Sequence, residues 1–293
     1  MATPSAPSRP DAPAGSPLDG LRIAVVGAGT MGSAIAGGLA RAGAFPRAEL
    51  RVANRHPAAA EALAAGIPGA RALGAPEACA DADLVLVCVK PRDVPGLLAE
   101  LEAAGALAAR PGRERPLLVS IAAGVSVASI DAATGGRLPV VRAMPNTASV
   151  IGRGCTVLSP GPRATADDLA AATAVFASVG TCLTLDERHL DAVTAVSASG
   201  PAFIYVVLEA LVDGAVSCGL PRAAAMELVA RMTEGAAGMV LATGRHPAAL
   251  KDDVTTPGGC TIAGLMVLED GRARSVLART IETTTRVAAG LSR

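Results

Sequence analysis

The sequence predicts an α/β domain built on a parallel β-sheet, followed by a domain made of helices alone. Over residues 21–185, short apolar runs of strand length alternate with helical stretches, which is typical of a parallel sheet with crossover helices. After Asp186 no strand pattern returns, and long helical stretches follow one another. The length of 293 residues suits two domains of ordinary size.

The strands of the predicted sheet are short runs dominated by Val, Leu, Ile and Ala. They are expected at Leu21–Val26, Leu50–Ala53, Leu84–Val89, Leu117–Ile121, Val140–Ala143, Thr156–Leu158 and Thr181–Leu185. Helices around them are expected at Met31–Arg41, Pro57–Ala65, Val94–Ala104 and Ala166–Ser178. Residues 1–20 are mostly Pro, Ala, Ser and Gly, without an apolar core, so they predict a disordered tail rather than a secretory signal.

The first domain is expected to span residues 21–185, and the helical domain residues 186–293. Its helices are expected at Glu187–Val196, Pro201–Ser217, Arg222–Leu241, Thr261–Glu269 and Ala273–Ala288. Gly219 and Pro221 predict the end of one helix and the start of the next. A helical domain of this size and apolar content often completes its core by dimerising, so we expect a homodimer or a higher oligomer of dimers.

The composition excludes several classes of partner. Lys plus Arg and Asp plus Glu both number 26, which leaves no basic footprint for nucleic acid or an anionic membrane. Without Trp and with only 1% aromatic residues, a base-stacking surface is excluded. The six Cys form no C-x-x-C pair and the three His lie far apart, so we expect no metal site, and reduced thiols in a cytoplasmic protein. Apolar stretches 23–40 and 192–208 are interrupted by Gly or Pro, which disfavours a membrane span.

A glycine motif follows the first predicted strand and opens the first predicted helix. It reads Gly27-Ala28-Gly29-Thr30-Met31-Gly32. In this context G-x-G-x-x-G predicts a dinucleotide site. The first glycine permits a tight turn, the second lets a pyrophosphate approach the backbone, and the third lets helix and strand pack closely. The alternative is a glycine-rich turn that holds no ligand.

The end of the second predicted strand bears on the choice between NAD and NADP. An NAD site carries Asp or Glu about 20 residues after the glycines, where it holds the ribose hydroxyls. Here the strand ends in Asn54-Arg55-His56, without an acid. Asn54 can form hydrogen bonds and Arg55 can bind a 2′-phosphate, so we expect NADPH, with NADH as a second cofactor. The alternative is that Arg55 is a solvated loop residue in an Arg-rich chain.

Three further strand ends should border the same crevice, because ligands bind at the carboxyl ends of the strands in such sheets. These ends carry Val89-Lys90-Pro91, which contains one of the two lysines, then Ala122-Ala123, and finally Asn146. The alanines are small enough for a cofactor to lie against, and the Asn146 amide suits a carboxamide. For each, the alternative is a loop residue chosen for turn chemistry, and for Asn146 the two interpretations are evenly matched.

A second candidate site lies in the segment Thr256-Pro-Gly-Gly-Cys-Thr261. Thr256 is expected to cap a helix whose first residue is Pro257. Gly259, Cys260 and Thr261 would then offer backbone N–H groups to a small carboxylate, with the Thr261 hydroxyl beside it. The alternative is an ordinary capped helix start. No Ser/His/Asp triad, carboxylate pair or activated Cys is apparent, which favours hydride transfer, where a cofactor carries the chemistry.

Together these motifs resemble those of the pyrroline-5-carboxylate reductase family. The matching segments are Gly27–Gly32, Val89–Pro91, Arg142–Thr147, Ser199–Ala202 and Thr256–Thr261, and the resemblance runs from about residue 20 to the C-terminus. The glycine motif is shared by many dehydrogenases, and the last three segments are far more specific. The sequence departs from the usual family pattern at Ala198, Phe203, Thr256 and Cys260.

The resemblance implies a Rossmann domain, a helical dimerisation domain, and an active site shared across the dimer. The implied activity is NADPH-dependent reduction of (S)-1-pyrroline-5-carboxylate to L-proline, the last step of proline biosynthesis, by hydride transfer to the protonated cyclic imine. The implied cofactor site comprises Gly27, Ala28, Gly29, Thr30, Met31, Gly32, Asn54, Arg55, Val89, Lys90, Pro91, Ala122, Ala123 and Asn146. The implied substrate site comprises Glu187, Thr256, Gly259, Cys260 and Thr261, with Thr261 as the catalytic residue that orients the ring nitrogen.

Two other functions are compatible with parts of the pattern. A β-hydroxyacid dehydrogenase would need a catalytic Lys inside the helical domain, and the candidate, Lys251, is expected in a loop before Thr256. A non-catalytic NADP-binding protein would keep Gly27–Gly32 but lack a formed second site, and the Thr256–Thr261 segment argues against this.

Overall fold

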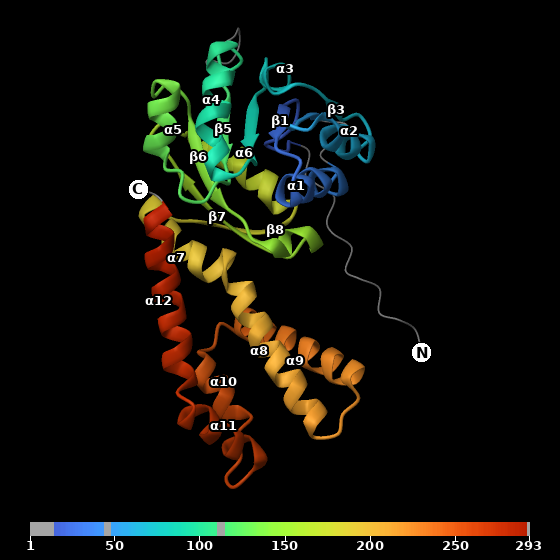
Figure 1. The fold of residues 1–293 in the computed structure, drawn as a ribbon, viewed down its shortest axis with the longest axis vertical. Helices are drawn as coiled ribbons and strands as arrows, with labels where there is room; N and C mark the ends of the chain where they lie inside the picture. The colour runs from blue at the N-terminus through green and yellow to red at the C-terminus, as the bar shows by residue number, and fades with distance from the viewer. Residues whose placement is uncertain (1–14, 44–47, 110–114, 292–293) are drawn as a thin grey trace. The chain divides into compact units, whose positions relative to one another are not determined.

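The computed structural model describes residues 15–43, 48–109 and 115–291, which form two compact units (Figure 1). The first unit comprises the residues up to Ala198 and those from Thr285 onward, and the second comprises Ser199–Thr284. The division falls after residue 198, not at the expected 185, because the intervening segment packs on the first unit. Leu190, for example, is buried with Met144 and Val157.

The expected tail of residues 1–20 falls mostly outside the described residues, which begin at Gly15. Within its described part, Leu18 is buried in the hydrophobic core of the first unit. The packed domain therefore begins before Leu21, the residue expected from the sequence.

The first unit is built on an eight-stranded sheet of order β3-β2-β1-β4-β5-β6-β7-β8. Its strands are β1 (Arg22–Val26), β2 (Glu49–Ala53), β3 (Arg71–Ala72), β4 (Leu84–Val87), β5 (Leu117–Ser120), β6 (Val140–Met144), β7 (Gly154–Pro160) and β8 (Gly180–Thr184). The predicted parallel sheet is confirmed for every pair except β6–β7, which is antiparallel. Residues 145–153 between these two strands are too few for a parallel crossover, which needs about a dozen residues or more.

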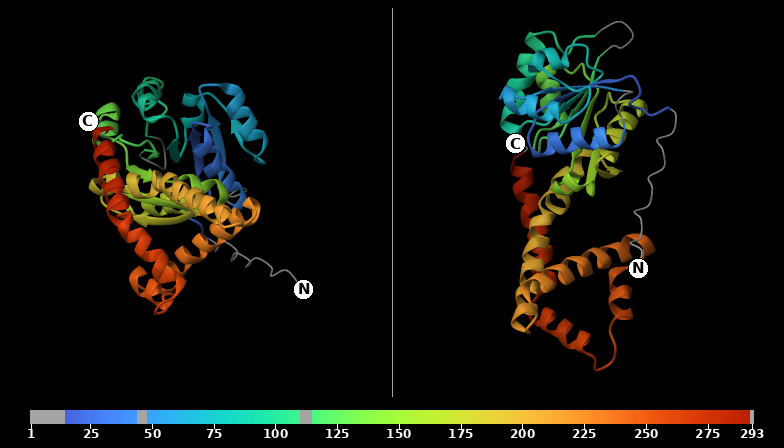
Figure 2. Two further views of the ribbon diagram at one scale, coloured as in Figure 1. Left: turned by 60° about the horizontal axis from the view of Figure 1, so that its bottom comes forward. Right: turned by 90° about the vertical axis from the view of Figure 1, so that its right-hand side faces the viewer.

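Helices cover both faces of this sheet, so its central strands have two buried faces (Figure 2), whereas the edge strands β3 and β8 are partly exposed. Helices α1 (Thr30–Arg41), α2 (Pro57–Ala65) and α6 (Ala166–Ala177) contribute to one core, and α3 (Ala75–Cys79), α4 (Val94–Ala103) and α5 (Val127–Thr134) to the other. Ile23 and Val25 of β1 belong to the first core, and Ala24 and Val26 to the second. Burial on both faces explains why the strands appear in the sequence as continuous apolar runs.

The strand order reverses between β1 and β4, which lie side by side at the centre of the sheet. From β1 the sheet continues to β2 and β3, and from β4 it continues to β5 and β6. At such a switch point the loops after the two strands lead to opposite faces and leave a crevice where ligands bind. The turn after β1 and the 3₁₀ helix η1 (Pro91–Asp93) after β4 therefore border one crevice.

Short helical segments connect the last strands and lead toward the second unit. They are η2 (Thr147–Ile151), η3 (Glu187–His189), α7 (Leu190–Val193) and the π-helix η4 (Thr194–Ala198). The second unit contains α8 (Gly200–Ser217), α9 (Arg222–Thr243), α10 (Pro247–Asp253), α11 (Cys260–Asp270) and α12 (Ala273–Leu291) up to Thr284. The prediction of a helical second domain is confirmed, although α10 was not expected.

Much of the apolar surface of the second unit is exposed within a single chain. Helices α8 and α9 pack through Val212, Ala225 and Val229. Large apolar side chains elsewhere in the unit are exposed, among them Tyr205 and Leu241. By length and composition, the helical stretch 187–217 could cross a membrane. Its most apolar 18 residues have a mean hydropathy of 1.7, and 11% of them are buried. Its composition also suits a helix that packs against a second protein chain.

Two adjacent glycines of α1 provide a test of how closely this helix packs on the connection between α6 and β8. A Cβ at Gly38 would lie 2.3 Å from Cγ1 of Val179 and 3.1 Å from the backbone oxygen of Ser178, whereas at Gly37 it would meet only the mobile end of Arg41, at 3.2 Å. We expect Gly38→Ala to lower the free energy of unfolding by about 1–3 kcal/mol. Gly37→Ala should leave it unchanged or raise it by about 1 kcal/mol, through helix propensity. Urea unfolding measures both, and equal losses would contradict the packing described.

Candidate functional site

The glycine turn after β1 approaches the end of β4 so closely that no side chain fits between them. Gly27 has a φ of +115°, and a Cβ there would lie 2.7 Å from the carbonyl carbon and oxygen of Cys88. A Cβ at Gly32 would lie 1.9 Å from the carbonyl oxygen of Gly27. Both positions therefore require glycine for the packing of strand, turn and helix.

Gly29 differs from these two glycines because the space beside it is open. No atom outside its own chain neighbours lies within 4 Å of the position where its Cβ would be. Gly29 is also the N-cap of α1, which begins at Thr30, so the first N–H groups of the helix start here. A helix N-terminus beside open space favours an anionic ligand.

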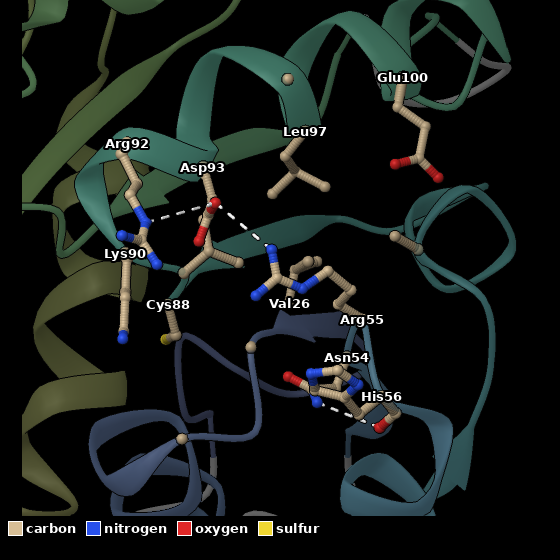
Figure 3. Close-up of a pocket in the computed structure, with 15 residues that line it drawn as sticks. Val26, Asn54, Arg55, His56, Cys88, Lys90, Arg92, Asp93, Leu97 and Glu100 are labelled. Atoms are coloured by element: carbon tan, nitrogen blue, oxygen red, sulfur yellow. Dashed lines mark hydrogen bonds and ion pairs between the residues drawn. The ribbon is translucent and has the colours of Figure 1, made fainter.

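A cavity of about 660 Å³ lies at this point, between the ends of β1, β2 and β4 and the start of α4 (Figure 3). We call it the switch-point cavity. Its lining residues are Val26, Gly27, Gly29, Asn54, Arg55, His56, Ala75, Cys88, Val89, Lys90, Arg92, Asp93, Gly96, Leu97 and Glu100. Its volume lies within the usual range for a cofactor site, about 300–1,000 Å³. Six of the expected cofactor residues therefore line one cavity: Gly27, Gly29, Asn54, Arg55, Val89 and Lys90.

Asn54 connects the end of β2 to the glycine turn. Its Oδ1 accepts a hydrogen bond from the backbone N–H of Ala28 at 3.2 Å, and its Nδ2 donates to the carbonyl of His56 at 3.1 Å. The side chain therefore holds the two loops that border the cavity in a fixed relation.

Three basic side chains border the switch-point cavity: Arg55 after β2, and Lys90 and Arg92 after β4. Arg55 Nη1 lies 3.5 Å from Asp93 Oδ1, and Arg92 Nε lies 4.0 Å from the same oxygen. Among the described residues, Lys90 is exposed and makes no ion pair. The cavity thus offers positive charge to an anionic ligand, together with open backbone at Gly29.

The remaining expected cofactor residues are not among those lining the cavity. Thr30 and Met31 begin α1, and Pro91 begins η1. Ala122 is buried in a core, and Ala123 packs beside Met144 and Val157.

Both ends of the Asn146 amide are engaged within the protein. Nδ2 donates to Ser197 Oγ at 3.3 Å, and Oδ1 accepts from the N–H of Cys155 at 3.3 Å. This amide joins the loop after β6 to the start of β7 and to η4.

A half-buried ion pair, which the sequence reasoning missed, holds η3 against the sheet of the first unit. Arg142 on β6 donates from Nη1 to Glu187 Oε1 at 2.8 Å, and the two side chains are 6% and 34% exposed. The same oxygen accepts from the N–H of Val127, the first residue of α5, at 2.8 Å. Glu187, expected in the substrate site, thus ties β6, α5 and η3 together through Oε1. The only sequence signal was an Arg inside an otherwise apolar strand.

None of the cysteines near the cavity is activated. Burial raises the pKa of the Cys88 thiol, which lines the cavity, and raises that of Cys79 to about 12. Both remain neutral thiols at physiological pH.

The second candidate segment lies in the helical unit, and its helix begins within one residue of the expected Thr261–Glu269 but without the expected cap. Helix α11 starts at Cys260 with Gly259 as its N-cap, so the expected cap at Thr256 is wrong. Gly258 has a φ of +70°, which a helix cannot accommodate, and residues 256–259 form a turn closed by the Gly259 N–H and the Thr256 carbonyl at 3.1 Å. Because the helix starts at Cys260, the N–H groups of Cys260 and Thr261 lie in its first turn and have no hydrogen-bond partner within the helix.

The turn also explains why a glycine stands before the helix. A Cβ at Gly259 would lie 2.4 Å from Thr256 Oγ1. The Thr261 side chain is partly exposed, and its hydroxyl makes no hydrogen bond among the described residues. A free hydroxyl beside unpaired N–H groups suits a small polar ligand.

The expected position of Lys251 is also wrong. It lies on helix α10, where it pairs with Asp252, and not in a loop. Its position therefore no longer argues against a β-hydroxyacid dehydrogenase, and that question is decided by the comparisons below.

Two sequence families match this chain. Residues 22–124 match the family described as "NADP oxidoreductase coenzyme F420-dependent", and residues 187–291 match "Pyrroline-5-carboxylate reductase dimerisation". The pyrroline-5-carboxylate reductase of Arabidopsis thaliana is 37% identical over 266 residues, which cover 89% of this chain and 92% of that protein.

Solved structures of similar proteins have the same fold. A pyrroline-5-carboxylate reductase from Coxiella burnetii superposes with a TM-score of 0.86 at 29% identity, covering 94% of this chain and all (100%) of that one. The Plasmodium falciparum pyrroline carboxylate reductase, solved with NADP bound, superposes with a TM-score of 0.81 at 24% identity, over 94% of this chain and 100% of that one.

The role of the Arg142–Glu187 pair in joining β6, α5 and η3 can be tested by substitution. Glu187→Ala leaves a buried guanidinium and the Val127 N–H without their acceptor, so we expect the free energy of unfolding to fall by about 1.5–3 kcal/mol. Glu187→Gln keeps an acceptor oxygen and should lose roughly half as much. Glu61→Ala, on the exposed surface of α2, is the control and should change it by less than about 0.5 kcal/mol. Equal values for Glu187→Ala and the control in urea unfolding would contradict this role.

Proposed function

This chain belongs to the pyrroline-5-carboxylate reductase family, and from this premise we propose which of its residues perform the reaction. It is an oxidoreductase that reduces (S)-1-pyrroline-5-carboxylate to L-proline with a nicotinamide cofactor. The observation that carries this function is the similarity to a curated reductase over 92% of that protein's length. The match to the dimerisation family supports a homo-oligomer. The β-hydroxyacid dehydrogenase and the non-catalytic NADP-binding protein are not favoured.

We propose that NADPH is the preferred cofactor, that NADH is also used, and that the switch-point cavity binds both. The open backbone at Gly29, the start of α1 and the basic side chains around the cavity fit the phosphates of a dinucleotide. Arg55, at the end of β2, would hold the 2′-phosphate, and Lys90 would contact the cofactor from the end of β4. The bound cofactor supplies the hydride.

The proposed substrate site is the start of α11. The N–H groups of Cys260 and Thr261 would hold the substrate carboxylate, because a helix N-terminus favours an anion. Gly259, whose N–H closes the turn onto the Thr256 carbonyl, would contribute as the N-cap that places them. The free Thr261 hydroxyl would hydrogen-bond the ring nitrogen and hold its proton. Glu187 is retained as a proposed substrate-binding residue, because its Oε2 has no hydrogen-bond partner among the described residues while Oε1 keeps its structural role.

This proposal requires no strong acid or base from the protein. The substrate is a cyclic imine, which becomes electrophilic when its nitrogen is protonated, so the chain's task is to orient it and to exclude water. We further propose a cytoplasmic homodimer, or an oligomer of dimers, in which the apolar stretch 187–217 packs between subunits. NADPH oxidation with pyrroline-5-carboxylate, compared with 3-hydroxyacids, tests the function, and no turnover with the pyrroline would exclude it.

The role of Arg55 is tested by its removal. We expect Arg55→Ala to raise the dissociation constant of NADPH about 10-fold, since one charge-assisted contact is worth about 1.4 kcal/mol or more. The value for NADH should change less than about 2-fold, because NADH lacks the 2′-phosphate. Fluorescence titration of both cofactors measures this, and equal losses would show that Arg55 does not read the phosphate.

The role of Thr261 is tested by a pair of substitutions. Thr261→Ala should lower kcat/KM for the pyrroline roughly 10–100-fold, as expected for one orienting hydrogen bond of about 1.5–3 kcal/mol. Thr261→Ser retains the hydroxyl and should recover most of this loss. The NADPH dissociation constant should stay the same in both variants. An unchanged kcat/KM for Thr261→Ala would remove the assigned role.

A further inference from the structure

A carboxylate faces the proposed phosphate-binding arginine across the switch-point cavity. Asp93, the last residue of η1, directs its side chain toward Arg55 from the opposite wall (Figure 3). The contact joins Asp93 Oδ1 and Arg55 Nη1 at 3.5 Å. Neither residue is near the other in sequence, and both line the cavity.

Asp93 is held between two guanidinium groups. Its Oδ1 is 4.0 Å from Arg92 Nε as well as 3.5 Å from Arg55 Nη1. The Arg55 side chain is 71% exposed, so its ion pair is screened by water and is easily exchanged. If Arg55 turns to another anion, Arg92 stays beside Asp93 and leaves that carboxylate with a counter-ion.

The Arg55–Asp93 pair reverses the positions of acid and base that are typical of an NAD site. In such a site an acid at the end of β2 accepts hydrogen bonds from the ribose hydroxyls. Here the end of β2 carries Arg55, and the acid comes from η1 after β4. An anion that binds Arg55 must compete with Asp93 for the guanidinium and must tolerate a negative charge beside it.

We propose that Asp93 is a specificity-determining residue that weakens the preference for NADPH over NADH by neutralising Arg55. This rests on the proposed function, because it takes the 2′-phosphate as the ligand of Arg55. A ligand without that phosphate does not need Arg55 and is indifferent to the pair. Asp93 therefore lowers the affinity for NADPH but not that for NADH. The difference between the two affinities is smaller than it would be if Arg55 had no acidic partner.

The test is the affinity of the full-length protein for each cofactor. We expect Asp93→Asn to lower the dissociation constant of NADPH about 3- to 10-fold and to change that of NADH by less than about 2-fold. Adenosine 2′,5′-bisphosphate and 5′-AMP, titrated as probes that lack the nicotinamide, should show the same contrast. In the Arg55→Ala background the gain from Asp93→Asn should fall below about 2-fold, because Asp93 acts through Arg55.

Glu100→Gln is the matched control, since it also removes one negative charge from the cavity lining. Among the described residues, Glu100 forms no ion pair with Arg55, so this variant should leave the ratio of NADPH to NADH affinities unchanged. Weaker NADPH binding in Asp93→Asn, equal changes for both cofactors, an equal gain in Glu100→Gln, or a gain that persists without Arg55 would each overturn the proposal.

These outcomes are independent of the reaction assigned to the chain. All are binding measurements that need no pyrroline substrate. Failure of the reductase function would appear as absent turnover, whereas failure of this inference would appear as an unaltered affinity ratio.

Discussion

The close approach of the β1–α1 turn to the end of β4 is the constraint on which the first unit depends. Gly27 lies against the backbone of Cys88, and Gly32 lies against the carbonyl of Gly27. Backbone contacts at both points fix where α1 begins, and its N-terminus therefore borders the cavity at Gly29. The Asn54 amide extends the same arrangement to the end of β2 through the Ala28 N–H. The placement of the glycine turn in the cavity thus follows from backbone contacts and one side-chain amide.

Side chains then decide what charge this cavity presents. Arg55 and Lys90 come from different strand ends and line one cavity because the strand order reverses between β1 and β4. Asp93 enters from η1 and moderates the positive charge of Arg55. Because the Arg55 side chain is exposed, its interaction with Asp93 is weak and can be exchanged for one with a ligand. A binding site that must release its cofactor after each reaction benefits from such exchangeable contacts.

The helical unit, unlike the first unit, buries few of its apolar side chains within one chain. Its buried residues Val212, Ala225 and Val229 make a small core, and most of its large apolar side chains are exposed in a single chain. A second copy can cover this surface, in agreement with the dimerisation family that it matches. The start of α11 offers backbone N–H groups and one hydroxyl rather than charged side chains.

The sequence by itself determined the alternation of strands and helices, the glycine turn after β1 and the basic residue after β2. These features depend on neighbouring residues, whose periodicity and turn chemistry appear directly in the chain. Only the tertiary structure decided the antiparallel β6–β7 pair, the contact of Asp93 with Arg55 and the ion pair of Arg142 with Glu187. These join residues distant in sequence, whose meeting depends on how the sheet is assembled. The start of α11 at Cys260 was likewise decided by the backbone, because Gly258 adopts a positive φ that composition alone does not reveal.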